Sequence, residues 1–253
     1  MVILKRAQAH CTTKIITLQV LISDTMIQRR IAIINLMLFI SAGLSSQTVP
    51  KPNYGLKSHE TLEIDKVEMT REKTVLHLTI ENRIENGSFC ADRKIYITDP
   101  AGNRIRLIRA AGIPVCPDTY KFKQPGEKLG FTLTFPALEG EPAWIDLKED
   151  CSENCFSFYG VVLDEFMNSR LDEAFSMAER GESLKAMDRF INISEAAAKH
   201  SGIRALVYYN IIKLATETGN TVKAGEWYKK LSSISSRGGK IYIDQLNVQG
   251  IRY

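Results

Sequence analysis

The chain has five cysteines, and the four that lie after residue 46, Cys90, Cys116, Cys151 and Cys155, are its residues best suited to covalent chemistry. In an oxidising compartment such thiols pair as disulfides, and four cysteines allow three pairings. We expect Cys90 to pair with Cys116, which would close a loop long enough for about 3–4 kcal/mol of stabilisation. We expect Cys151 to pair with Cys155, which would close a very small ring and shape a turn.

The short spacing of Cys151 and Cys155 also fits a redox-active pair. Thiol–disulfide enzymes favour two intervening residues and a first thiol at a helix N-terminus, which lowers its pKa. Here three residues intervene between two expected strands, so a structural disulfide is favoured and an enzyme is the alternative. His59, His77 and His200 show no ligand spacing from the cysteines, and we predict no metal and no cofactor.

Two further groups of side chains could bind a partner. Arg104, Arg106 and Arg109 form a basic stripe that could hold an anionic glycan or a lipid headgroup. The favoured alternative is that they are charged edge-strand residues, which discourage association between sheets. Tyr208 and Trp227 have helical spacing typical of packing residues, but Trp227 is predicted to face outward and to anchor a peptide.

A secretory leader is predicted inside the chain, starting at Met26. Two arginines follow this methionine, then an apolar run from Ile31 to Ala42, then small residues up to Ser46. These are the three parts of a signal peptide, and the run is shorter than the roughly 20 residues of a permanent span. Residues 1–46 are therefore expected to be an upstream extension and a cleaved leader, with an uncleaved anchor or a buried helix as the alternative.

Cleavage of this leader would change the charge balance of the protein. The full chain has 33 Lys and Arg against 29 Asp and Glu, whereas 28 of each lie after Ser46. A near-neutral protein has no general attraction for phosphate backbones, so we predict no nucleic acid partner. We expect an exported protein, periplasmic or extracellular, without a stable membrane span.

The elements that must position these residues begin with a strand-rich segment, residues 58–165, after a proline-containing linker at 47–57. Leu76, Leu78 and Ile80 alternate with polar residues, which is typical of a half-buried strand. A similar run from Leu62 to Met69 slips by one residue at Asp65-Lys66, which fits a β-bulge. Strands are also expected at 94–98 and 103–108, joined as a hairpin, and at 131–135, 143–147 and 156–163. Seven short strands favour an immunoglobulin-like antiparallel sandwich, with a small barrel as the alternative.

Helical periodicity replaces the alternation between residues 166 and 236 and predicts four helices in two hairpins. Three residues recur after 38 positions, Gly181, Ala186 and Phe190 as Gly219, Ala224 and Tyr228, and such recurrence indicates an internal repeat. Residues 237–253 are expected to add a last strand or to form a mobile tail.

The second helical pair resembles a tetratricopeptide repeat. It has aromatic residues Tyr208 and Tyr209 on its first helix, Gly219 at the turn, and Ala224 and then Tyr228 on its second helix. The resemblance covers residues 170–235 and implies stacked helical hairpins that present a concave face to a protein ligand. The strand-rich half is similar in layout to immunoglobulin-like β domains of uncharacterised exported bacterial envelope proteins, a likeness that implies no activity.

The sequence therefore predicts an α+β multidomain protein, an antiparallel β-sandwich followed by TPR-like hairpins. We expect an exported, non-enzymatic envelope protein that acts as an interaction or scaffold module, with a protein partner in the envelope. The alternative ligand is a carbohydrate or cell-wall glycan bound by the sandwich. That role requires two or more exposed aromatic residues on one sheet face, whereas Tyr96, Trp144 and Tyr159 are scattered along the chain.

Overall fold

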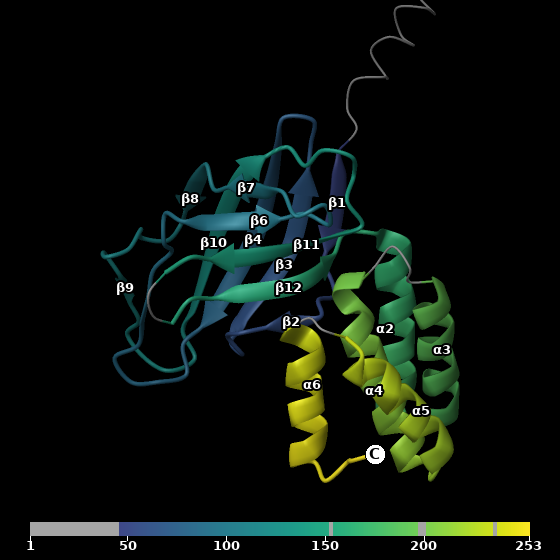
Figure 1. The fold of residues 1–253 in the computed structure, drawn as a ribbon. Coiled ribbons are helices and arrows are strands. Elements are labelled where there is room, and N and C mark those ends of the chain that lie inside the picture. Colours follow the sequence, from purple (N-terminus) through teal and green to yellow (C-terminus); the bar gives the residue numbers. More distant parts are fainter. Residues whose placement is uncertain (1–45, 152–153, 197–200, 235–236) are drawn as a thin grey trace, which may run out of the picture. The chain divides into compact units, whose positions relative to one another are not determined.

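The computed structural model describes residues 46–151, 154–196, 201–234 and 237–253, and Ser46 to Tyr253 form one compact unit. Strands come first and helices follow, as predicted (Figure 1). Within the described ranges, every helix is too short or too polar to span a bilayer. The predicted leader, the start at Met26 and the upstream extension lie outside the described residues, except for Ser46.

Two five-stranded antiparallel sheets make up most of the described β region, residues 46–163. In spatial order, sheet A contains β1 (Gln47–Pro50), β3 (Leu62–Met69), β4 (Lys73–Glu81), β10 (Lys128–Pro136) and β8 (Arg109–Ala111). In spatial order, sheet B contains β2 (Leu56–Lys57), β12 (Ser157–Val162), β11 (Trp144–Glu149), β6 (Ile95–Thr98) and β7 (Arg104–Arg106). A separate two-stranded sheet pairs β5 (Ser88–Phe89) with β9 (Tyr120–Lys121).

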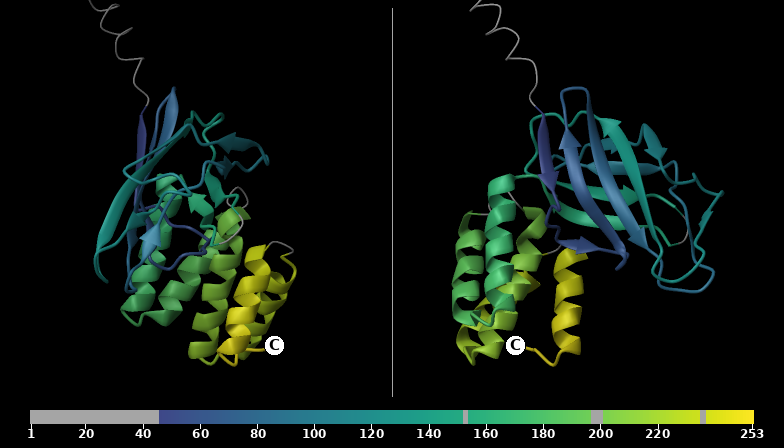
Figure 2. Two further views of the ribbon diagram at one scale, coloured as in Figure 1. Left: turned by 90° about the vertical axis from the view of Figure 1, so that its left-hand side faces the viewer. Right: turned by 180° about the vertical axis from the view of Figure 1, so that it is seen from behind.

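The two large sheets, which Figure 2 shows from two further sides, share one hydrophobic core. The alternation read from the sequence determines which residues enter this core. In β4, Leu76 and Leu78 are buried in this core. The predicted hairpin joins β6 to β7, and the predicted slip in β3 is a register shift between Ile64 and Lys66. All seven predicted strands are therefore present.

The predicted linker at 47–57 is wrong, because this segment contributes a strand to each large sheet. β1 pairs with β3, where Val49 lies opposite Val67, and β2 pairs with β12. The prolines had suggested an unpaired segment, yet a proline is tolerated where a strand lies at a sheet edge and needs donors on one side only. Both β1 and β2 are edge strands.

The described helical region, residues 164–253, contains five α-helices and one short 3-10 helix. They are α2 (Glu165–Glu179), α3 (Ser183–Ala196), η2 (Ser201–Ile203), α4 (Arg204–Glu217), α5 (Thr221–Ser232) and α6 (Arg237–Val248). α2 packs against α3, α3 against α4, and α4 against α5, so the predicted hairpins are present. Gly181 and Gly219 follow the first helix of each hairpin at φ of 75° and 74°, a conformation that side chains with a β-carbon disfavour. The 38-residue recurrence is therefore a recurrence of the same turn.

The prediction of a strand or mobile tail at 237–253 is also wrong, because α6 occupies most of this segment. Tyr242 and Leu246 are buried and lie four residues apart, which places them on one face of the helix. This helix packs against α4 and α5. Gly238 and Gly239 lie in its first turn.

The helical region meets sheet B at a very close contact between backbones. η2 packs against β11 and β12, and a Cβ built on Gly202 would lie 2.8 Å from the Cα of Gly160. The same Cβ would lie 2.8 Å from the ring of Trp144. Only residues without a side chain allow the two layers to approach this closely.

Candidate functional site

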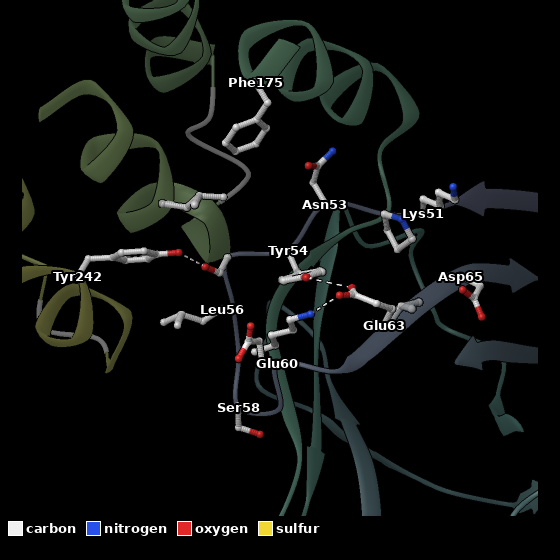
Figure 3. Close-up of a pocket in the computed structure, with 15 residues that line it drawn as sticks. Lys51, Asn53, Tyr54, Leu56, Ser58, Glu60, Glu63, Asp65, Phe175 and Tyr242 are labelled. Carbon is white, nitrogen blue, oxygen red and sulfur yellow. Dashed lines mark hydrogen bonds and ion pairs between the residues drawn. The ribbon is translucent and has the colours of Figure 1, made fainter. Parts of the chain in front are cut away.

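A cleft of about 820 Å³ opens beside residues 51–58, where the β region meets the helical region (Figure 3). The walls come from the whole of this segment, from the start of β3, and from α2, α4 and α6. The lining residues are Lys51, Pro52, Asn53, Tyr54, Gly55, Leu56, Lys57, Ser58, Glu60, Glu63, Ile64, Asp65, Phe175, Leu206 and Tyr242. A cavity of this size can hold several residues of a peptide or one small organic molecule.

Apolar side chains from three elements line part of this cleft. Leu56 comes from β2, Phe175 from α2 and Leu206 from α4, and each is partly buried against the helical core. The ring of Phe175 is held edge to face against Phe190, with 5.2 Å between the centroids. The cleft therefore offers a preformed apolar surface to an incoming side chain.

A charged cluster of Tyr54, Lys57 and Glu63 lines the same cleft. The Tyr54 hydroxyl donates to Glu63 Oε2 at 3.1 Å, and the Lys57 ammonium forms an ion pair with the other carboxylate oxygen (Figure 3). Burial raises the pKa of Tyr54. Burial alone would lower the pKa of Lys57, but its hydrogen bonds to Glu63 and Tyr54 raise it. Lys57 therefore remains an ammonium group at neutral pH.

The segment beside the cleft is attached to α2 by a buried asparagine. Asn168 accepts a hydrogen bond from the backbone N–H of Asn53 at 2.7 Å and donates one to the carbonyl of Val162 at 2.9 Å. The Asn53 side chain also donates to Asp172 Oδ1 at 2.8 Å. One side chain of α2 thus fixes both the cleft segment and the end of β12.

Tyr242 attaches the same segment to α6, although the two lie far apart in the sequence. Its buried hydroxyl donates to the carbonyl oxygen of Gly55 (Figure 3). Burial raises the pKa of Tyr242 well above its ordinary value, so the hydroxyl keeps its proton and remains a donor. Its ring lies 4.8 Å from that of Tyr209, centroid to centroid.

Replacing Tyr242 by phenylalanine is expected to lower the free energy of unfolding by about 1–3 kcal/mol, because the Gly55 carbonyl would lose its buried donor. Tyr209→Phe is the matched control, since its hydroxyl interacts with Gln249 at the exposed surface. That change should cost about 0.5 kcal/mol or less. Urea unfolding monitored by circular dichroism measures both, and equal losses would contradict a special role for Tyr242.

A terminal strand of a sheet also lines the cleft. β2 is the last strand of sheet B, and among the described residues β12 is the one strand that pairs with it. Its residues and their neighbours line the cleft, so a strand edge and the apolar surface lie in one cavity. An extended peptide can pair with a sheet edge of this kind while its side chains enter adjacent pockets.

The structure corrects the prediction that Trp227 faces outward. Its side chain is 6% exposed and contacts Tyr208 edge to face, with 5.0 Å between the ring centroids. The ammonium of Lys230 lies 3.7 Å from the centroid of the indole ring. Trp227 therefore acts as a packing residue between α4 and α5.

Tyr208, the other aromatic residue predicted to bind a partner, lines a second cavity of about 570 Å³. This cavity adjoins the cleft, because Gly55, Leu56 and Tyr242 line both. Trp144 and Tyr159 of sheet B line the second cavity as well. Of the two aromatic residues predicted for binding, Tyr208 therefore lines a cavity, whereas Trp227, which it contacts, is buried in the core.

Arg104 and Arg106 are exposed on β7, the edge strand of sheet B, as the charged-edge interpretation predicted. Arg109 lies on β8 and belongs to sheet A. The predicted stripe of three arginines is therefore divided between two sheets.

Both predicted disulfides are present. The Cys90–Cys116 bond spans 26 residues and the Cys151–Cys155 bond spans four. The second bond lies in the loop between β11 and β12 rather than at a helix N-terminus, which favours a structural role. Burial raises the pKa of the adjacent Glu149 carboxyl, although backbone N–H groups donate to it.

Three residues that build the cleft, Asn53, Tyr54 and Tyr242, were missed by reasoning from sequence. Two of them lie in the predicted linker and the third in the predicted tail. For Tyr242 a signal was available. It lies four residues before Leu246, a spacing that is typical of one face of a helix. Nothing local in the sequence indicates that positions 55 and 242 meet.

The described residues contain no group of three or more His, Cys, Asp or Glu side chains that could hold a metal ion. His77 interacts with Glu68 through Nε2 at 3.0 Å on sheet A. Compared with known proteins, the chain matches no protein-family model, none of the curated proteins and none of the solved structures. The function must therefore be argued from the site alone.

Proposed function

We propose that this chain is an exported, non-enzymatic binding protein that holds an extended segment of another envelope polypeptide in the cleft beside residues 51–58. The observation that carries the proposal is the position of β2, an edge strand that lines a cavity together with apolar residues of the helices. The backbone of the ligand would pair with this edge, and an aliphatic or aromatic side chain would contact Leu56, Phe175 and Leu206.

The rigid attachment of the cleft supports binding by a preformed site. Residues 53 and 55 are held by Asn168 and Tyr242, which belong to different helices. A site that is ordered before binding loses less conformational entropy when the ligand arrives. This arrangement is the one expected of a stable interaction module.

Export is supported by the two disulfides, which are typical of oxidising compartments. We further propose that the β region is immunoglobulin-like and that the helical hairpins are TPR-like. The support for the second likeness is the repeated turn glycine and the buried alanine five residues later in each hairpin, Ala186 and Ala224. In this proposal the helices contribute the cleft wall rather than a concave surface of their own.

The partner can be identified by placing a photo-crosslinking amino acid at position 56 in the native host. Val222, 74% exposed on α5, is the control position because it does not line the cleft. A partner captured from position 56 and absent from position 222 would supply the sequence from which test peptides are made. Equal capture from both positions would contradict the proposal.

Leu206→Glu is expected to weaken binding of the captured partner's peptide at least about tenfold, because a carboxylate would enter the apolar surface of the cleft. Leu184→Glu is the matched control, since Leu184 is 60% exposed on α3 and does not line the cleft. Fluorescence anisotropy with the synthetic peptide gives both affinities. Unchanged affinity in Leu206→Glu would reject the cleft as the binding site.

A further inference from the structure

The β6–β7 end of sheet B carries a cavity of about 470 Å³ that the cleft does not include. It is lined by Arg93, Lys94, Ile95, Tyr96, Arg104, Arg106 and Asp150. Arg93, Lys94, Arg104 and Arg106 are all exposed, and we call these four residues the basic edge. Their charges outnumber the single carboxylate of Asp150.

The basic edge is free of internal ion pairs. Within the described residues, none of its four cations lies within 4.0 Å of a carboxylate, although ion pairs occur elsewhere in the β region, as between Lys57 and Glu63. The chain after Ser46 has equal numbers of positive and negative residues. Four cations beside one carboxylate in an otherwise neutral protein create a local positive potential that attracts anions.

Aromatic rings contact two cations of this face, Arg104 of the basic edge and Lys148 of β11. The guanidinium of Arg104 lies 4.8 Å from the centroid of the Tyr96 ring, and the ammonium of Lys148 lies 4.9 Å from that of Tyr159. Cation–π contacts of this kind restrict the side chains before a ligand arrives. Less entropy is then lost on binding.

Strand register places positive charges in a row across the sheet. Tyr96 lies directly opposite Arg106 on one side and opposite Lys148 on the other. Because neighbouring strands are about 4.8 Å apart, the backbones at Arg106 and Lys148 are about 10 Å apart. Lys148 is partly neutralised by Asp146 at 2.8 Å, so the charge is concentrated toward β7.

We propose that the basic edge binds an acidic polysaccharide through the carboxylate groups of successive sugars. Exposed ion pairs contribute only about 0–1 kcal/mol each, so a single anion would bind weakly, whereas a polymer of anions engages several cations at once. Guanidinium groups also match the planar geometry of carboxylates. Ile95, the one aliphatic residue that lines this cavity, is fully buried, so a peptide would find no aliphatic anchor there.

This proposal is independent of the cleft and is compatible with the edge-protecting role of the arginines. Charged side chains on β7 oppose pairing with a second sheet. The same charges remain available to a ligand that approaches the face of sheet B.

The test is binding of a long oligogalacturonate to the purified protein by isothermal titration calorimetry at low ionic strength. We expect binding that weakens as salt is added, and at least about a tenfold loss in the double variant Arg104→Ala/Arg106→Ala. Arg109→Ala is the matched control, because Arg109 is exposed nearby in sequence but lies on sheet A. A neutral maltooligosaccharide of the same length should not bind.

Three results would overturn the proposal: unchanged affinity in the double variant, an equal loss in Arg109→Ala, or equal binding of the neutral oligosaccharide. Tighter binding of polyaspartate, single-stranded DNA or phosphatidylglycerol vesicles at the same concentration of negative charge would overturn the assignment to a polysaccharide. If the double variant fails to fold, Arg93→Ala/Lys94→Ala provides the same test. These two residues also belong to the basic edge, but they precede β6 and lie outside any strand. The melting temperature of each variant identifies a folding failure.

Discussion

Replacing Gly160 by alanine is expected to lower the free energy of unfolding by about 2–5 kcal/mol. Gly160 has a φ of 65°, which costs an L residue about 1–2 kcal/mol. Its new Cβ would lie 2.4 Å from the carbonyl oxygen of Gly202, so η2 would have to move away from β12. Overpacking of this kind typically adds about 1–3 kcal/mol.

Gly140→Ala separates the two causes. Gly140 has a similar φ of 71°, but a Cβ added there would have no atom beyond its chain neighbours within 4 Å. In Gly140→Ala the free energy of unfolding should therefore fall only by the cost of an L residue at positive φ, about 1–2 kcal/mol. Urea unfolding of both variants measures the difference, and equal losses would show that the approach of the two layers contributes nothing.

Removal of the Cys90–Cys116 bond, by Cys90→Ala/Cys116→Ala, is expected to cost about 3–4 kcal/mol. This disulfide spans 26 residues, and the entropy that a cross-link removes from the unfolded chain grows with loop length. The bond also holds in place a backbone hydrogen bond, which the N–H of Cys116 donates to the carbonyl of Ala91 at 3.1 Å. Loss of the bond should therefore loosen the loops around β5 and β9.

Cys151→Ala/Cys155→Ala is the corresponding control, because its bond spans four residues. The same chain-entropy relation gives about 2 kcal/mol for so short a loop. Unfolding under non-reducing conditions compares the two double variants. A larger loss from the short bond would contradict the entropic explanation and would indicate a special role for the loop between β11 and β12.

The strands were predictable because their signal is local. Alternation in β4 and the slip at Asp65-Lys66 depend on neighbouring residues only, and both are confirmed by the register. The disulfide pairing was a preference among the three that the sequence leaves open, and it is confirmed. The turn glycines of the helical hairpins belong to the same class of short-range signal.

The cleft was not predictable, because its contacts join distant parts of the sequence. Gly55 meets Tyr242 across 187 residues, and Asn53 meets Asn168 across 115. The prolines suggested a linker at residues 47–57, and the C-terminal pattern suggested a last strand or a mobile tail, but tertiary contacts override such local preferences. The burial of Trp227 has the same cause. Its position along α5 could not show that Tyr208, which belongs to α4, covers its ring.

Translation makes the segment around Gly55 before it makes α6. Because the hydroxyl of Tyr242 completes the attachment of that segment, the cleft cannot be complete until α6 has been made. A protein cut short before α6 would retain both sheets of the β region but would lack one wall of the cavity and the anchor of its edge strand. Chains that end before α6 would therefore lack a complete cleft.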